Sequence, residues 1–176
     1  AAGKPSSAHH RVPGANDRIT VGFIGLGWQG FDGHLVTVRD HGLELNVAAG
    51  AVCEPWTIRL ERARAALDLP GSSAYTDYRK LLDRTDIDAV FIGTPEFWHA
   101  RIARDAIAAG KHVYCEKPLT RYLGEALELH DTVVGSDRVF QLGSQYCSEG
   151  KWHKAAELIN AGRIGALVLA QASYMR

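Results

Sequence analysis

The chain has 176 residues, of which 46% are hydrophobic, so it is long enough for one full domain and a remainder. Its 20 lysine and arginine residues balance 20 aspartate and glutamate residues, so no net field favours nucleic acid or an anionic membrane as a partner. No apolar run reaches the roughly 18 residues of a spanning helix, and Cys53, Cys115 and Cys147 have neither the number of a disulfide framework nor the spacing of a zinc site.

The first 17 residues form the least structured part of the sequence. They are rich in Ala, Ser, Gly, Pro and His and show no hydrophobic period. We expect residues 1–17 to be a flexible, extended arm.

A strand leads directly into a glycine-rich turn after this arm. Ile19 to Ile24 is a short apolar run that suits a buried parallel strand. Gly25, Gly27 and Gly30 then give the spacing G-x-G-x-x-G, in which glycines allow a tight turn, a close approach of pyrophosphate and packing of the next helix. That helix, expected from Trp28 to about His41 and ended by Gly42, would point its free N–H groups at the phosphates. Alone, the motif is equally consistent with a plain tight turn.

An acidic residue after the second predicted strand strengthens the dinucleotide interpretation. Leu45 to Cys53 is the strand, and Glu54 follows 24 residues after Gly30. A carboxylate there can accept hydrogen bonds from the adenosine ribose diol. It would also repel a 2′-phosphate, which favours NAD over NADP, although Arg59 would soften that preference. The alternative is a solvated loop residue at the start of the next helix.

The rest of the chain alternates helices with strands. Asp77 is expected to cap a short helix, and Thr120 to cap a longer one. The expected elements are a helix from Trp56 to Leu67 ended by Pro70 and Gly71, a helix from Tyr78 to Leu82, a strand from Asp88 to Gly93, a helix from Glu96 to Ala109 ended by Gly110, a strand from His112 to Cys115, a helix from Arg121 to Val134 and a strand from Val139 to Leu142. This alternation predicts an α/β fold with a doubly wound parallel sheet, the Rossmann architecture.

Ligands of such sheets bind outside the carboxyl ends of the strands. This rule selects five clusters with polar or backbone-special residues: Gly25 to Gly30, Glu54, Thr94 to His99, Glu116 to Pro118, and Gly143 to Gln145. Each cluster alone could be an ordinary loop, so the prediction depends on their convergence.

Lys117 is the candidate catalytic residue. An ammonium at a strand exit can hydrogen-bond a substrate hydroxyl, stabilise an alkoxide and relay a proton. Glu116 could orient the lysine or a ribose, and Pro118 stiffens the backbone behind it. The alternative is a plain Glu-Lys pair on the surface.

The sequence resembles the glucose-fructose oxidoreductase, inositol dehydrogenase and rhizopine catabolism family, called Gfo/Idh/MocA. The resemblance comes from Gly25-Leu-Gly-Trp-Gln-Gly30, Glu54, Gly93-Thr-Pro-Glu-Phe-Trp-His99, Ala109-Gly-Lys-His-Val-Tyr-Cys-Glu-Lys-Pro-Leu119 and Gln141-Leu-Gly-Ser-Gln145. It implies a nicotinamide cofactor, a sugar or polyol substrate and a catalytic-centre lysine at Lys117. The predicted cofactor-binding set is Gly25, Gly27, Trp28, Gln29, Gly30, Glu54, Thr94, Pro95, His99, Glu116, Pro118 and Gln145, with Lys117 and Glu116 as the catalytic pair and no metal site.

The resemblance also sets expectations about the two ends of the chain. Tyr146 and Cys147 stand where many relatives have a basic residue, so substrate contacts differ there. The predicted domains are residues 18–163 for dinucleotide binding and 164–176 for the start of a second, substrate-binding domain, with a strand from Gly165 to Met175. A homo-oligomer or another chain would then supply the rest. Ala15 to Arg18 resembles the junction after a twin-arginine leader, so cytoplasmic and exported locations both stay open.

Three classes of function remain open at this point. The first is an NAD-dependent oxidoreductase acting on a carbohydrate. The second is a hydrolase of the same family, in which tightly held NAD transiently oxidises a sugar so that the glycosidic bond can break by elimination. The third is a nucleotide-binding module without activity of its own. Flavin or S-adenosylmethionine binding is a weaker rival, disfavoured by the Glu-Lys-Pro strand exit.

Overall fold

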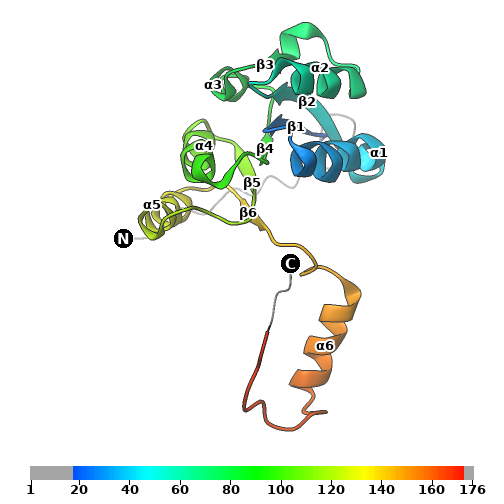
Figure 1. Ribbon diagram of the computed structural model, residues 1–176, viewed down its shortest axis with the longest axis vertical. Coiled ribbons are helices and arrows are strands. Elements are labelled where there is room, and N and C mark those ends of the chain that lie inside the picture. The colour runs from blue at the N-terminus through cyan, green and yellow to red at the C-terminus, as the bar shows by residue number, and fades with distance from the viewer. Residues whose placement is uncertain (1–17, 173–176) are drawn as a thin grey trace, which may run out of the picture. The chain divides into compact units, whose positions relative to one another are not determined.

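A computed structural model describes residues 18–172, and its central feature is one parallel sheet (Figure 1). Six strands lie in the order β3-β2-β1-β4-β5-β6, and every pair of neighbours is parallel. The strands are β1 (Ile19–Ile24), β2 (Val47–Cys53), β3 (Ala74–Tyr75), β4 (Ala89–Ile92), β5 (His112–Glu116) and β6 (Phe140–Gly143). The predicted α/β class and doubly wound topology are therefore confirmed.

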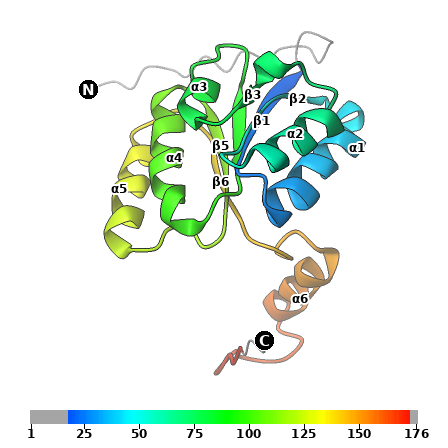
Figure 2. The same cartoon turned by 45° about the horizontal axis from the view of Figure 1, so that its top comes forward.

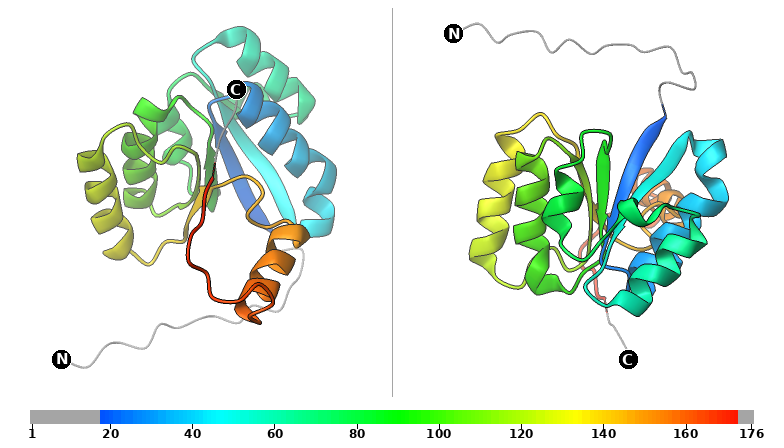
Figure 3. Two further views of the ribbon diagram at one scale, coloured as in Figure 1. Left: turned by 60° about the horizontal axis from the view of Figure 1, so that its bottom comes forward. Right: turned by 90° about the horizontal axis from the view of Figure 1, so that it is seen from above.

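Helices cover both faces of this sheet, as Figures 2 and 3 show. Their bounds are α1 (Val36–Leu45), α2 (Thr57–Ala66), α3 (Tyr78–Leu82), α4 (Glu96–Ala108) and α5 (Leu123–Val134), with a π-helix η2 (Gln29–Leu35) before α1 and a 3-10 turn η3 (Gly71–Ser73). The helices α4 and α5 lie on one face and α1 and α2 on the other (Figure 2). Because each face is covered, the strands are apolar on both sides.

Each face has its own apolar core. On the α4 side, Ile92, Ile102 and Leu129 belong to one buried cluster. On the α1 side, Phe23 and Leu35 belong to the other. These two clusters hold the sheet in place from both sides. The position of the edge at which its strands end is therefore fixed as well.

The first helix differs from its prediction. It begins as a π-helix and continues through Gly42 to Leu45, where Asn46 ends it in the left-handed conformation with φ 54°. Gly42 is buried, and a Cβ there would lie 2.6 Å from the carbonyl oxygen of Val47. The prediction that Gly42 ends the helix is wrong because this glycine serves the close approach of α1 to β2.

Most other predicted elements are present within a few residues. The strand β1 has the predicted bounds, and Asp77 caps α3 by accepting a hydrogen bond from the Arg79 N–H. Thr120, in contrast, is not the cap of α5, which begins at Leu123. There the Tyr122 N–H donates to the Glu125 carboxylate at 3.2 Å, and the Thr120 hydroxyl donates to the Tyr122 carbonyl.

The chain divides into two compact units after Gly143, whereas the sequence prediction placed a domain boundary after residue 163. The second unit contains α6 (Gly150–Asn160). The predicted strand from Gly165 to Met175 is not formed over its described part, residues 165–172, because no neighbouring strand pairs with it there. Residues 173–176 and the predicted arm, 1–17, lie outside the described residues. The start of a second domain stays a prediction.

Candidate functional site

The glycine turn after β1 has the geometry that its sequence predicts. Gly25 has φ 86°, and a Cβ there would lie 2.6 Å from the Thr94 nitrogen. A Cβ on Gly30 would lie 1.9 Å from the Gly25 carbonyl oxygen. Gly27 instead faces open space, because a Cβ added there would meet only an Arg59 nitrogen, 3.7 Å away. Gly25 and Gly30 therefore allow close packing, and Gly27 leaves room for a ligand beside the backbone.

Glu54 joins the end of β2 to this turn. One carboxylate oxygen accepts a hydrogen bond from the Leu26 N–H at 2.8 Å, and the other accepts one from the Trp56 N–H at 3.1 Å. A carboxylate has about four lone-pair sites, so two remain for a ligand. The side chain is thus fixed in place and still able to accept further hydrogen bonds.

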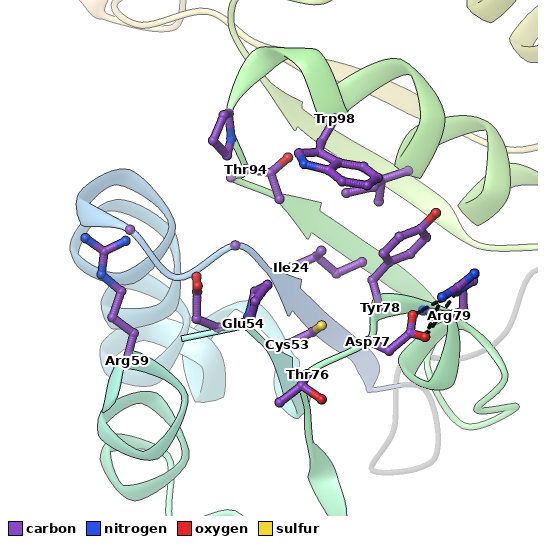
Figure 4. Close-up of a pocket in the computed structure, with 16 residues that line it drawn as sticks. Ile24, Cys53, Glu54, Arg59, Thr76, Asp77, Tyr78, Arg79, Thr94 and Trp98 are labelled. Atoms are coloured by element: carbon purple, nitrogen blue, oxygen red, sulfur yellow. Dashed lines mark hydrogen bonds and ion pairs between the residues drawn. The ribbon is translucent and has the colours of Figure 1, made fainter. Parts of the chain in front are cut away.

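A cavity of about 710 Å³ opens beside the turn (Figure 4). Five predicted cofactor-binding residues line it: Gly25, Gly27, Glu54, Thr94 and Pro95. Thr76 and Tyr78, which lie outside the five selected clusters, also line it. Trp98 lines it as well; this residue lies within the Thr94 to His99 cluster but is not among the predicted cofactor-binding residues. Tyr78 and Trp98 pack edge to face, with ring centroids 6.4 Å apart. Tyr78 belongs to α3 and Trp98 to α4, and the sequence alone does not reveal that these two helices lie close together.

Thr94 lines the cavity and carries a polar atom without a partner. Its hydroxyl oxygen is buried and has no hydrogen-bond partner among the described residues. Buried polar groups are normally hydrogen-bonded, so rotation of this side chain toward a polar ligand in the cavity would satisfy the hydroxyl. Cys53 also lines the cavity, and burial raises the pKa of its thiol to about 12, so it is a neutral wall residue rather than a nucleophile.

Glu116 ties the end of β5 to the helix that follows the turn. It is buried, and one carboxylate oxygen accepts hydrogen bonds from Gln29 Nε2 at 3.2 Å and from His34 Nε2 at 2.9 Å. The other oxygen accepts one from the Lys117 N–H at 3.2 Å. The predicted residues Gln29 and Glu116 are therefore in direct contact, although they are far apart in sequence.

His34 is the contact of Glu116 that the sequence analysis missed. It is buried, and its ring lies 5.3 Å from that of Phe91 and 5.0 Å from that of Tyr114. Burial lowers the pKa of His34, while the Glu116 charge opposes that shift. The sequence does contain a signal that His34 is buried, because its position lies on the apolar helix face formed by Phe31, Leu35 and Val38.

His99 joins the ends of β4 and β5. Its ring is 1% exposed, with Nε2 2.7 Å from the Thr94 carbonyl oxygen and Nδ1 2.8 Å from the Pro118 carbonyl oxygen. Both ring nitrogens therefore face backbone carbonyls that belong to two strand exits.

The remaining predicted residues lie at the surface. Lys117 and Pro118 are exposed directly after β5, and Trp28 is 76% exposed at the start of η2. Gln145 is exposed within the second unit, so its role as a cofactor contact stays a prediction. Among residues 18–172, no group of three or more His, Cys, Asp or Glu side chains could hold a metal ion. In the same part of the chain, no helix has the length and apolar character needed to cross a membrane.

Comparison with known proteins supports the dinucleotide interpretation. A family model described as an oxidoreductase family with an NAD-binding Rossmann fold matches residues 19–144. Among solved structures, the scyllo-inositol dehydrogenase of Lactobacillus casei with bound NAD(H) and scyllo-inositol has a TM-score of 0.77 and 26% identity, covering 84% of this chain and 42% of that one. A 3-ketoreductase of Actinomadura kijaniata in complex with TDP-benzene and NADP has a TM-score of 0.73 and 26% identity, covering 85% and 45%.

Curated relatives point to a second activity. A "glycosyl hydrolase family 109 protein 2" from a Shewanella species is 31% identical over 166 residues, which is 90% of this chain and 36% of that protein. An α-N-acetylgalactosaminidase of Shewanella oneidensis is 30% identical over 164 residues, covering 89% and 35%. The chain thus spans about a third of the length of these relatives.

Proposed function

Because this chain belongs to the Gfo/Idh/MocA family of oxidoreductases and contains its NAD-binding Rossmann domain, we propose that it holds the dinucleotide for oxidation of a carbohydrate hydroxyl, with Lys117 as the acid/base. The observation that carries the proposal is the convergence of the glycine turn, Glu54 and the unpartnered Thr94 hydroxyl on one cavity. The dinucleotide, when bound, would supply the hydride acceptor for that oxidation.

The chain's own residues would bind and orient the dinucleotide. The open backbone at Gly27 and the start of η2 suit a pyrophosphate, and Glu54 retains acceptor sites for a ribose diol. Thr94 would use its free hydroxyl on the same ligand. Lys117, exposed at the end of β5, would hydrogen-bond the substrate hydroxyl and take its proton as the alkoxide forms.

NAD is the cofactor that this site favours over NADP. The Glu54 carboxylate is fixed at the cavity wall and would repel a 2′-phosphate. Arg59 also lines the cavity, with its guanidinium stacked 4.7 Å from the centroid of the Trp56 ring, and would attract such a phosphate. The carboxylate is the closer of the two to the glycine turn, so the balance favours NAD.

A glycoside hydrolase is the second candidate, because the curated relatives at 30–31% identity are named as such. In that reaction the sugar would be oxidised only transiently, the glycosidic bond would break by elimination with loss of the aglycone, water would add to the resulting double bond, and hydride would return to the sugar. Both candidates use the same cofactor site and the same lysine. They differ in the net products.

Dinucleotide binding by the purified chain tests the part of the proposal that both candidates share. We expect calorimetry to detect NAD uptake by the wild type, and expect Gly30→Ala to abolish it because the new Cβ would collide with the Gly25 carbonyl. Gly71→Ala is the matched control, since nothing lies within 4 Å of the added atom. Failure of well-folded wild-type chain to bind dinucleotide would overturn the proposal.

The net products of turnover separate the candidates. Accumulation of NADH with a free sugar or polyol would identify a dehydrogenase, whereas release of sugar from a glycoside without net NADH would identify the hydrolase. In either case Lys117→Met should lower turnover by about 100-fold or more while leaving NAD binding largely intact. Equal turnover by Lys117→Met would remove the lysine from the mechanism.

A further inference from the structure

Two buried histidines hold the segment that contains Lys117, and they reach it from opposite faces of the sheet. His34 belongs to η2, which continues into α1, and His99 belongs to α4 (Figure 2). The contact of His34 is the Glu116 carboxylate, whose second oxygen accepts from the Lys117 N–H. One contact of His99 is the Pro118 carbonyl. Residues on both sides of Lys117 are thus fixed from separate helices.

The π-helical winding of η2 explains how two of its side chains reach one carboxylate. Gln29 and His34 are five residues apart, and in an α-helix such residues point roughly 140° away from each other. A π-helix closes its hydrogen bonds between residues five apart, so these positions come near each other on one face. Both Nε2 atoms accordingly lie within 3.2 Å of the same Glu116 oxygen.

The two histidines differ in what their ring nitrogens face. Both nitrogens of His99 lie against backbone carbonyl oxygens, Nε2 2.7 Å from that of Thr94 and Nδ1 2.8 Å from that of Pro118. His34 donates from Nε2 to a carboxylate, and its buried ring packs against Phe91 and Tyr114. The Glu116 contact therefore requires a proton on Nε2 of His34, whereas the Pro118 contact requires one on Nδ1 of His99.

We propose that His34 and His99 are positioning residues that clamp the Glu116–Pro118 backbone from the two faces of the sheet and so set the direction of the Lys117 amine. His99 also fixes the Thr94 carbonyl, so the same clamp sets the spacing between the exits of β4 and β5. The importance of this direction for catalysis depends on the function proposed above. The clamp itself is a property of the folded chain and can be tested separately.

The wild-type chain gives the first test and needs no variant. Nitrogen-15 NMR of labelled histidine at neutral pH should show a hydrogen-bonded proton on Nδ1 of His99 and one on Nε2 of His34. An unprotonated Nδ1 at His99 would overturn its half of the clamp, and a proton on Nδ1 alone at His34 would overturn the other half.

Matched variants give the second test. Glutamine can place an amide donor near Nε2, the nitrogen by which His34 contacts Glu116, and asparagine can place one near Nδ1, the nitrogen by which His99 contacts Pro118. Leucine has no donor, so His34→Leu is compared with His34→Gln and His99→Leu with His99→Asn. We expect amide exchange at Lys117 to accelerate about tenfold and the Kd for NAD to rise about tenfold in the leucine variants, with most of each effect restored by the amide variants. His41→Leu is the control, because His41 is exposed on α1.

These measurements separate the clamp from the proposed function. If the wild type binds no NAD but the exchange and NMR results are as expected, the clamp stands and the function fails. If NAD binds but the leucine variants exchange Lys117 as slowly as His41→Leu, or the amide variants restore neither exchange nor affinity, the clamp is wrong. Should a leucine variant fail to fold, the wild-type spectrum still decides.

Discussion

At the scale of single residues, the proposed preference for NAD over NADP depends on Glu54. Its two oxygens are held by the N–H groups of Leu26 and Trp56, so the charge cannot swing away from an incoming 2′-phosphate. Glutamine at this position would keep only one acceptor oxygen and no charge. We expect Glu54→Gln to weaken NAD binding about tenfold and to weaken NADP binding less, so that the preference for NAD shrinks.

Titration of the chain with each dinucleotide measures that preference. Glu61→Gln is the control, since Glu61 lies on α2 in an exposed pair with Arg64. An unchanged ratio of the NAD and NADP dissociation constants in Glu54→Gln would show that another group, such as Arg59, sets the selectivity.

His34 links stability to pH. Burial lowers its pKa below the ordinary value of 6.5, so below pH 6.5 the unfolded chain takes up a proton that the folded chain does not. This contribution to stability is present above pH 6.5 and is lost as the pH falls toward the lowered pKa. We expect urea unfolding to give a lower free energy of unfolding at pH 5.5 than at pH 7.5, and expect that difference to be smaller in His34→Gln. An equal pH dependence in the variant would contradict the assignment.

At the scale of elements, two glycines in helices illustrate what sequence reasoning can and cannot decide. Gly42 in α1 meets the Val47 carbonyl, whereas Gly124 in α5 has nothing within 4 Å of an added Cβ. Alanine favours a helix over glycine by up to about 1 kcal/mol. We therefore expect Gly124→Ala to stabilise the chain by ~0.5 kcal/mol, and Gly42→Ala to destabilise it by about 1–2 kcal/mol because overpacking outweighs the propensity.

Chemical denaturation of the two variants measures the sign of both changes in the free energy of unfolding under one set of conditions. If Gly42→Ala proved as stable as the wild type, the close contact between α1 and β2 would have to relax at little cost. The sequence carries no information on this contact, because the partner of Gly42 is a backbone atom.

Element positions were nevertheless predictable from local patterns. The apolar run of β1 and the cap at Asp77 are local features, and both are found where the sequence predicts them. The winding of η2 and the end of α1 were missed because each depends on a tertiary partner, the Glu116 carboxylate in one case and β2 in the other.

At the scale of the whole molecule, topology explains how much of the candidate site the sequence could predict. All strands of a parallel sheet end at one edge, so the residues that follow β1, β2 and β4 had to lie near one another. This reasoning selected Glu54 and Thr94 before their contacts were known. It could not select Tyr78, and it could not single out Trp98 within the Thr94 to His99 cluster, because both reach the cavity through helix packing.

In the second unit, the helix α6 tests whether this part of the chain is stable by itself. The helix α6 has 11 residues and none of them is buried, with Trp152 54% and Ile159 40% exposed. Isolated helices of this length are marginal in water. In contrast, α4 buries six residues, including His99 and Ile102. We expect the amides of α6 to exchange with solvent more than ~100-fold faster than those of α4, because local opening needs little free energy where no side chain is buried.

Hydrogen exchange followed by mass spectrometry on the intact chain measures both helices in one sample. Protection of α6 equal to that of α4 would contradict the expectation, since it would require Trp152 and Ile159 to be covered in solution. Dilution of the sample then distinguishes the source of the cover: protection that falls with concentration would come from a second copy, and protection that persists would come from the same chain. Either result would say whether the residues after Gly143 need a second copy of the chain to be ordered.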